Sequence, residues 1–135
     1  MLKTGILNPS LLSLLARVRH TNMLVISDRG FPYWPRIETV DLSLVDDIPT
    51  VLQVFEAVRE CCDVGEVFMA QEFLAENTNA VKDAFSTAMK DIPVTYEPHT
   101  LFKTKVPQAI GLIRTGDTTQ YANMIIVSER LEEDV

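Results

Sequence analysis

Met23-Leu24-Val25-Ile26-Ser27 is an apolar run of strand length, and Asp28-Arg29-Gly30-Phe31-Pro32 follows it with turn-forming residues. A strand that stays apolar until its last residue is typical of one buried on both faces, as in a parallel sheet covered by helices. The run therefore predicts a central strand of a layered α/β domain. Asp28 is expected at the carboxyl end of this strand, where ligands collect in open α/β sheets.

Helix and strand patterns alternate on both sides of this strand, as in α/β layered proteins. Asn8 precedes Pro9 as a helix cap, and apolar residues then recur at helical spacing. The patterns predict helices over 8–19, 49–58 and 79–90, a short helix after His99, and strands at 23–27, 37–42, 64–70, 94–96, 109–114 and 124–127. No linker or internal repeat divides the chain, so residues 1–135 are expected to form a single domain.

The composition excludes several classes of partner. The chain has 135 residues, 47% of them hydrophobic, and a formal charge of -7. This length and apolar content suit one domain with a sizeable core. The acidic balance argues against binding duplex nucleic acid or an anionic membrane surface. No apolar run approaches the ~20 residues of a membrane span, and no signal peptide is visible. Two adjacent cysteines suit a reducing compartment, so a cytoplasmic protein is expected.

Standard cofactor and metal motifs are absent from the sequence. There is no phosphate-binding Walker loop, no GxGxxG, no CxxC and no HExxH. The chain has two histidines, and their spacing to Asp28 does not support a metal site. We therefore predict neither a metal nor a nucleotide cofactor.

A few polar residues near strand ends are candidates for binding or catalysis, and each also has a purely structural interpretation. His20 precedes the buried strand and could act in catalysis or simply close the preceding helix. Asp28 could bind a ligand or form an Asx turn before Gly30. His99 could line a site or be a surface residue. Tyr121 and Asn123 precede another apolar strand and could belong to a site or complete a turn.

For three other features we favour a structural role over a functional one. Trp34 could stack on a sugar or anchor an interface, but packing within its loop is expected. The adjacent Cys61 and Cys62 lie on a helical pattern and are expected to pack. The acidic stretch 129–134 is expected to be solvated charge.

Several fragments, taken in order from Lys3 to about Val127, form a pattern of their own. They are Lys3-Thr4-Gly5-Ile6-Leu7-Asn8, Leu15-Ala16-Arg17-Val18-Arg19-His20-Thr21-Asn22, Val25-Ile26-Ser27-Asp28-Arg29-Gly30-Phe31-Pro32, residues 37–44, Ile48-Pro49-Thr50, Gln53-Val54, His99 with Phe102-Lys103, Ile113-Arg114-Thr115-Gly116-Asp117 and Tyr121-Ala122-Asn123-Met124-Ile125-Ile126. Together these fragments resemble the D-ribose pyranase and L-fucose mutarotase family, and the ribose branch is the more similar.

The resemblance implies a cofactor-independent isomerase that interconverts cyclic forms of a free monosaccharide. It implies His20 as proton donor, and Asp28, His99, Tyr121 and Asn123 as sugar-binding residues. It also implies a three-layer α/β/α sandwich with a mostly parallel mixed sheet, assembled as rings that commonly stack into decamers, with active sites at subunit contacts. Arg29, the Tyr33-Trp34 loop and the acidic stretch 129–134 depart from the family pattern.

The implied chemistry suits these residue types. Opening a cyclic hemiacetal places a proton on the ring oxygen and removes one from the anomeric hydroxyl, and imidazole, with an unperturbed pKa of ~6.5, exchanges protons near neutrality. Closure onto a different hydroxyl converts pyranose to furanose, and closure onto the other carbonyl face exchanges anomers. The alternatives are a fucose-type mutarotase and a non-catalytic sugar-binding accessory protein of sugar uptake.

Overall fold

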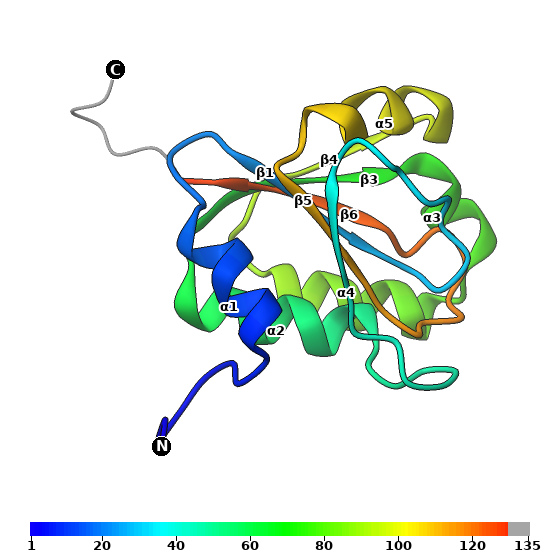
Figure 1. Cartoon of the computed structure of the whole chain (residues 1–135). Helices are drawn as coiled ribbons and strands as arrows, with labels where there is room; N and C mark the ends of the chain where they lie inside the picture. Colours follow the sequence, from blue (N-terminus) through cyan, green and yellow to red (C-terminus); the bar gives the residue numbers. More distant parts are fainter. Residues whose placement is uncertain (130–135) are drawn as a thin grey trace.

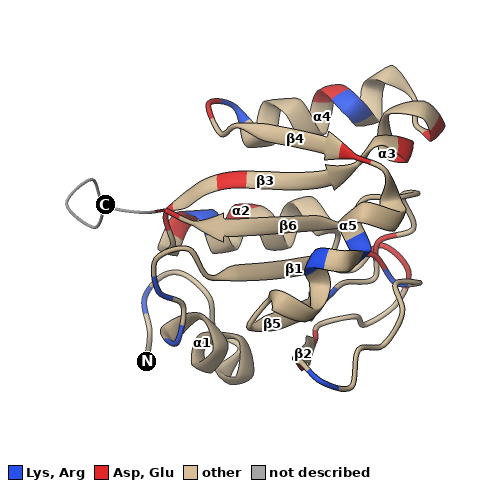
Figure 2. Ribbon diagram, turned by 90° about the horizontal axis from the view of Figure 1, so that it is seen from above, with Lys and Arg blue, Asp and Glu red and all other residues tan. Residues whose placement is uncertain are grey.

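The predicted strands form one mixed sheet. In the computed structural model, which describes residues 1–129, the sheet holds six strands: β1 (Met23–Ser27), β2 (Glu38–Asp41), β3 (Val64–Ala70), β4 (Val94–Glu97), β5 (Gly111–Arg114) and β6 (Met124–Ser128). Their order across the sheet is β2-β5-β1-β6-β3-β4. β1 is therefore central, as its apolar sequence predicts, and Figure 2 shows β1 and β6 without charged residues.

Strand direction decides which loops meet. β1 and β2 each pair with β5 in parallel, and β3 pairs with β4 in parallel. β6 runs antiparallel to both of its neighbours, β1 and β3. The first five strands therefore finish at the same end of the sheet, where β6 begins. We call this the C-terminal end of the sheet, and the other the N-terminal end. The prediction of a mostly parallel mixed sheet is confirmed.

Helices cover both faces of the sheet, as Figure 1 shows. One face carries α1 (Pro9–Ala16), α2 (Val51–Cys61) and α4 (Asn79–Met89), and the other carries α5 (His99–Lys105) with the short 3-10 turn η1 (Val106–Gln108). Each face has its own apolar cluster: Phe55 and Phe85 lie in the larger one, and Phe31 and Phe102 in the smaller one. The predicted three-layer α/β/α sandwich is confirmed.

Helix starts agree with local sequence signals to within two residues. Asn8 caps α1, because its side-chain oxygen accepts a hydrogen bond of 2.9 Å from the Leu11 N–H. α2 begins at Val51 rather than at Pro49, because Thr50 and Gln53 form a capping box. The cap of α4 is Thr78 rather than Asn79.

The first helix is shorter than the predicted range 8–19, and one helix was not predicted. The first helix ends at Ala16, so Arg17 and Arg19 follow it. Phe85 and Met89 are the buried residues of α4. The six-residue helix α3 (Gln71–Glu76) follows β3 without a connecting loop and was not predicted. No helix within residues 1–129 is long and apolar enough to cross a membrane.

Candidate functional site

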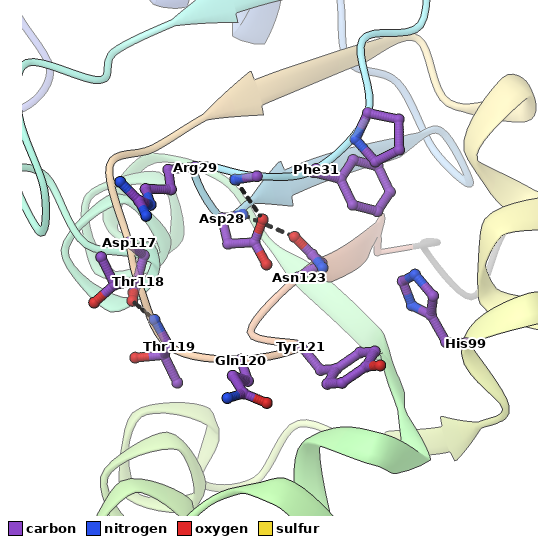
Figure 3. Close-up of a pocket in the computed structure, with 12 residues that line it drawn as sticks. Asp28, Arg29, Phe31, His99, Asp117, Thr118, Thr119, Gln120, Tyr121 and Asn123 are labelled. Carbon is purple, nitrogen blue, oxygen red and sulfur yellow. Dashed lines mark hydrogen bonds between the residues drawn. The ribbon is translucent and has the colours of Figure 1, made fainter.

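An open pocket of about 320 Å³ lies at the C-terminal end of the sheet. This volume is near the lower limit of the range for small-molecule sites, ~300–1,000 Å³. Its walls come from segments that strand direction brings together: the residues after β1 and β5, those before β6, and the start of α5 (Figure 3). The lining residues are Asp28, Arg29, Gly30, Phe31, Pro32, His99, Asp117, Thr118, Thr119, Gln120, Tyr121 and Asn123.

Asp28 and Asn123 lie at the adjoining ends of β1 and β6. The backbone N–H of Asp28 donates to Oδ1 of Asn123 over 2.7 Å, and Asn123 is only 3% exposed. Oδ1 of Asp28 in turn accepts from the N–H of Gly30 over 3.0 Å, which is the Asx turn expected from the sequence. The turn and the pocket thus use the same carboxylate, so the structural and functional interpretations of Asp28 are compatible.

The Asp28 carboxyl is partly shielded from water. Burial is the main cause that raises its pKa, and the nearby Asp117 carboxylate adds to this effect. Hydrogen bonds from the N–H groups of Gly30 and Phe31 and from the Asn123 side chain oppose the shift. Asp28 is therefore a carboxyl of raised pKa on the wall of a polar pocket.

His99 presents its imidazole among aromatic rings. Its ring stacks on Phe102 with centroids 5.9 Å apart and meets the rings of Tyr121 and Phe31 edge-on at 5.2 Å and 6.3 Å. Within the described part of the chain, no group forms a hydrogen bond to its buried Nδ1. Burial, and secondarily the Lys103 ammonium, lower the pKa of His99, while Glu72 and Asp28 act in the other direction. The imidazole is thus kept neutral to lower pH than an exposed one.

Tyr121 has an unusual backbone conformation. Its φ of 54° lies in the left-handed region, which non-glycine residues seldom adopt. This conformation lies two residues before Asn123, and the Tyr121 ring lies beside His99 on one side of the pocket (Figure 3). The pocket thus brings Tyr121 and Asn123 together with Asp28 and His99, the four residues that the resemblance implies as sugar-binding.

Asp117 is a pocket residue whose carboxylate the sequence analysis did not single out. It is 3% exposed, and its Oδ2 accepts from the Val51 N–H over 2.8 Å while its Oδ1 accepts from the Thr119 N–H over 2.8 Å. Its backbone oxygen also accepts from the Arg29 N–H over 3.0 Å. Asp117 thus joins the turn after β5 to the start of α2 and to the loop after β1. The sequence signal that could have identified Asp117 as a site residue was its place at the end of the fragment Arg114-Thr115-Gly116-Asp117, which is part of the family resemblance.

His20 lies away from this pocket in the single chain. It precedes β1, so it lies at the N-terminal end of the sheet, where its Nδ1 is 2.6 Å from the backbone oxygen of Glu129. The five residues of β1 separate it from Asp28, a span of about 16 Å at ~3.3 Å per residue. One chain therefore brings together Asp28, His99, Tyr121 and Asn123 but not His20.

Within residues 1–129, the other candidate residues that the sequence analysis discussed lie on the pocket rim or outside the pocket. Trp34 is half-buried and lies 6.4 Å from the Phe31 ring in the smaller apolar cluster, which agrees with the packing interpretation. Arg29 is on the pocket rim, where its Nη1 is 2.7 Å from Oδ1 of Asp46. Cys61 and Cys62 are free thiols at the end of α2; Cys62 packs against the larger apolar cluster as expected, whereas Cys61 is exposed, so the packing expected for it was wrong. Of the acidic stretch, residues 130–134 lie outside the described residues. Residues 1–129 contain no cluster of three or more His, Cys, Asp or Glu side chains suited to a metal ion.

Comparisons with known proteins agree with this architecture. The model of the RbsD / FucU transport protein family matches residues 1–129. Over 128 residues the chain is 39% identical to a D-ribose pyranase of Geobacillus thermodenitrificans, an alignment that covers 95% of this chain and 96% of the relative.

Two solved structures have the same fold. The structure of Bacillus subtilis RbsD complexed with D-ribose has a TM-score of 0.89 and 33% identity, and the match covers 97% of this chain and 99% of the other. A fucose mutarotase from Streptococcus pneumoniae in complex with L-fucose has a TM-score of 0.74 over 92% of this chain and 94% of the other, and at 14% identity this match shows the fold alone. From the family model and the sequence identity together, the chain belongs to the RbsD / FucU transport protein family.

Proposed function

We propose that this protein is an isomerase that interconverts the pyranose and furanose forms of a free monosaccharide of the D-ribose type. The observation that carries the proposal is the convergence of Asp28, His99, Tyr121 and Asn123 on one polar pocket at the C-terminal end of the sheet. The similarity to D-ribose pyranase and to a D-ribose complex supports this substrate class.

The pocket offers the hydrogen-bonding groups that a polyol needs. The amide oxygen of Asn123 is engaged by the Asp28 N–H, and its NH₂ group, which also hydrogen-bonds the Asp28 carboxyl, has a second N–H that can donate to a ligand. The Asp28 carboxylate accepts hydrogen bonds from sugar hydroxyls. The neutral His99 ring carries one N–H donor and one acceptor nitrogen, and the Tyr121 ring gives an apolar wall beside its hydroxyl.

Ring opening is proposed to proceed by acid–base catalysis. A proton is delivered from His20 to the ring oxygen, the bond between this oxygen and the anomeric carbon breaks, and a base or water removes the proton of the anomeric hydroxyl. The product is a neutral aldehyde, and attack by a different hydroxyl closes the other ring. General acid–base catalysis of this kind accelerates a reaction roughly 10²–10⁴-fold. The reaction transfers protons and breaks and re-forms a C–O bond without net oxidation or reduction, so we propose that it requires no cofactor.

The position of His20 makes this mechanism depend on a second copy of the chain. Because β1 separates His20 from the pocket in one chain, we propose that His20 of a neighbouring subunit reaches the pocket formed by Asp28 and Asn123. This agrees with the ring assembly and the sites at subunit contacts that the family resemblance implies. The proposed assembly is a homo-oligomer, a ring or a stacked-ring decamer, in the cytoplasm, where the two free thiols would stay reduced.

Saturation-transfer NMR on free sugars tests the proposal. The protein should accelerate exchange between the ring forms of D-ribose, and His20→Ala should remove most of this acceleration while leaving the fold intact. Exchange restricted to L-fucose anomers would instead assign a fucose-type mutarotase. A folded His20→Ala protein with unchanged exchange would exclude His20 from the mechanism.

A non-catalytic sugar-binding role is the second candidate. The description of the family as transport proteins favours it. Tight binding of ribose without faster ring exchange would support this role and contradict the isomerase proposal.

A further inference from the structure

Glu72 and His99 are brought together by the register of β3 and β4. These strands are parallel, and their last paired residues are Ala70 and Glu97. Glu72 lies two positions beyond Ala70, and His99 lies two positions beyond Glu97, so both occupy equivalent places past the C-terminal end of the sheet. The backbone N–H of His99 donates to both carboxylate oxygens of Glu72, at 3.1 Å and 3.2 Å.

This contact supplies a cap that α5 does not make for itself. The residue before the helix is Pro98, and it forms no side-chain cap. The first N–H groups of a helix have no acceptor within the helix, so an acceptor from another element stabilises its first turn. Glu72, the second residue of α3, provides that acceptor to His99, the first residue of α5.

The other end of α5 is also fixed. Nζ of Lys105 lies 2.7 Å and 2.9 Å from the two carboxylate oxygens of Glu97, which is 8% exposed. The same ammonium lies 4.9 Å from the centroid of the Phe68 ring on β3. With its last residue tied to the sheet, the orientation of α5 depends on how its first residue is held.

Glu72 also acts on the imidazole through its charge. Burial and the Lys103 ammonium lower the pKa of His99, and the Glu72 carboxylate opposes them together with Asp28. Glu72 itself is outside the set of residues that line the pocket. It therefore affects the pocket through His99 rather than by touching a ligand.

We propose that Glu72 is a positioning residue for the sugar site: it fixes the first turn of α5 and thereby the place of the His99 imidazole. This inference rests on the proposed function, because its consequence for affinity requires a sugar in the pocket. The consequence for the His99 imidazole does not require a sugar. Both the affinity and the titration of His99 can be measured in the full-length protein.

Two substitutions separate the two effects of Glu72. Glu72→Gln keeps a side-chain oxygen that can accept from the His99 N–H but removes the charge, whereas Glu72→Ala removes both. The matched control is Glu76→Ala, because Glu76 is an exposed carboxylate on the same helix. The measurements are the NMR titration of the His99 imidazole, the dissociation constant for D-ribose and kcat for ring exchange. The chain has two histidines, so a His20→Gln variant assigns the His99 signal.

The expected pattern is specific. Both Glu72 variants should lower the pKa of His99 below that of the wild-type protein, since each removes a negative charge. Glu72→Ala should weaken D-ribose binding by about 3- to 30-fold, the loss expected if the full effect of an N-cap fell on binding, with a smaller change in kcat. Glu72→Gln should restore most of the affinity, and Glu76→Ala should match the wild-type protein in all three measurements.

Other outcomes overturn the inference. It is wrong if Glu72→Ala leaves both the His99 titration and the affinity for D-ribose unchanged, or if Glu76→Ala changes them as much. A wild-type protein that binds ribose but does not exchange its ring forms would contradict the proposed function, while the titration and the affinity would still decide the role of Glu72.

Discussion

The backbone N–H of Asp28 and the side-chain oxygen of Asn123 are joined by a hydrogen bond of 2.7 Å across 95 positions of sequence. One residue follows β1 and the other precedes β6, and these strands are antiparallel neighbours. The bond therefore ties together the two segments that contribute carboxylate and amide groups to the pocket. Asn123 has both a structural and a proposed sugar-binding role.

Replacing Asn123 should affect stability as well as activity. Asn123→Ala leaves the partly buried Asp28 N–H without its acceptor; a fully buried unsatisfied group costs about 1–3 kcal/mol, so a loss of about 1 kcal/mol is expected. Urea unfolding should show this loss, and ring exchange should fall with it. The control is Gln120→Ala on the exposed rim, which should change stability by less than about 0.5 kcal/mol. Equal stability of the two variants would contradict the structural role of Asn123.

The raised pKa of Asp28 predicts a pH-dependent contribution to stability. Burial disfavours the carboxylate in the folded state, so the contribution of Asp28 is fully present below the ordinary pKa of Asp, ~3.9, and is lost as pH rises through the raised folded value. Asp28→Asn retains an oxygen for the Gly30 N–H and does not titrate. The unfolding free energy of the wild-type protein, relative to that of Asp28→Asn, should therefore fall between pH 3 and 7.

Urea unfolding of both proteins at a series of pH values measures this difference. The comparison cancels the titration of groups that the two proteins share. A difference that stays constant or grows with increasing pH would show that burial does not dominate the environment of Asp28.

Short-range signals made much of the fold predictable. The burial of β1 follows from its own five apolar or small residues, and the cap of α1 follows from Asn8 and Pro9. α3 was missed because a six-residue helix that directly follows a strand has no loop signal before it. The antiparallel direction of β6 depends on pairing with distant strands, and nothing in Met124–Ser128 alone encodes it.

The candidate site was only partly predictable for the same reason. Asp28 could be placed at a strand end from local sequence, but its meeting with Asn123 requires the direction of β6. Asp117 bonds to the N–H of Val51, 66 positions away, so its anchoring role is visible only in three dimensions. The separation of His20 from Asp28 was available from sequence, because a strand predicted between two residues places them at opposite ends of it.

The lowered pKa of His99 predicts a second pH effect, of opposite sign. Burial disfavours the imidazolium, so the contribution of His99 to stability is present above the ordinary pKa of His, ~6.5, and is lost as pH falls toward the lowered folded value. Relative to His99→Gln, the wild-type protein should lose unfolding free energy as pH falls below ~6.5. NMR titration should show His99 protonating below the usual range; protonation above ~6.5 would contradict the aromatic enclosure as the dominant influence.

Mixed assemblies of two variants test whether a site is shared between copies. His20→Ala and Asp28→Asn should each lose most ring exchange when pure. If His20 acts on the pocket of a neighbouring copy, a mixed oligomer contains some sites with an intact pocket from the His20→Ala chain and an intact His20 from the Asp28→Asn chain. Random mixing in equal amounts gives about one quarter of the sites both groups.

Coexpression of the two variants with different affinity tags, followed by tandem purification, yields the mixed oligomers for saturation-transfer NMR with D-ribose. Activity well above that of either pure variant is expected. Because the five-residue strand β1 lies between His20 and Asp28 in every chain, restored activity can come only from sites built by two copies. Mixed oligomers as inactive as the pure variants would mean that His20 does not serve a neighbouring pocket, and a wild-type protein that sediments as a fully active monomer would lead to the same conclusion.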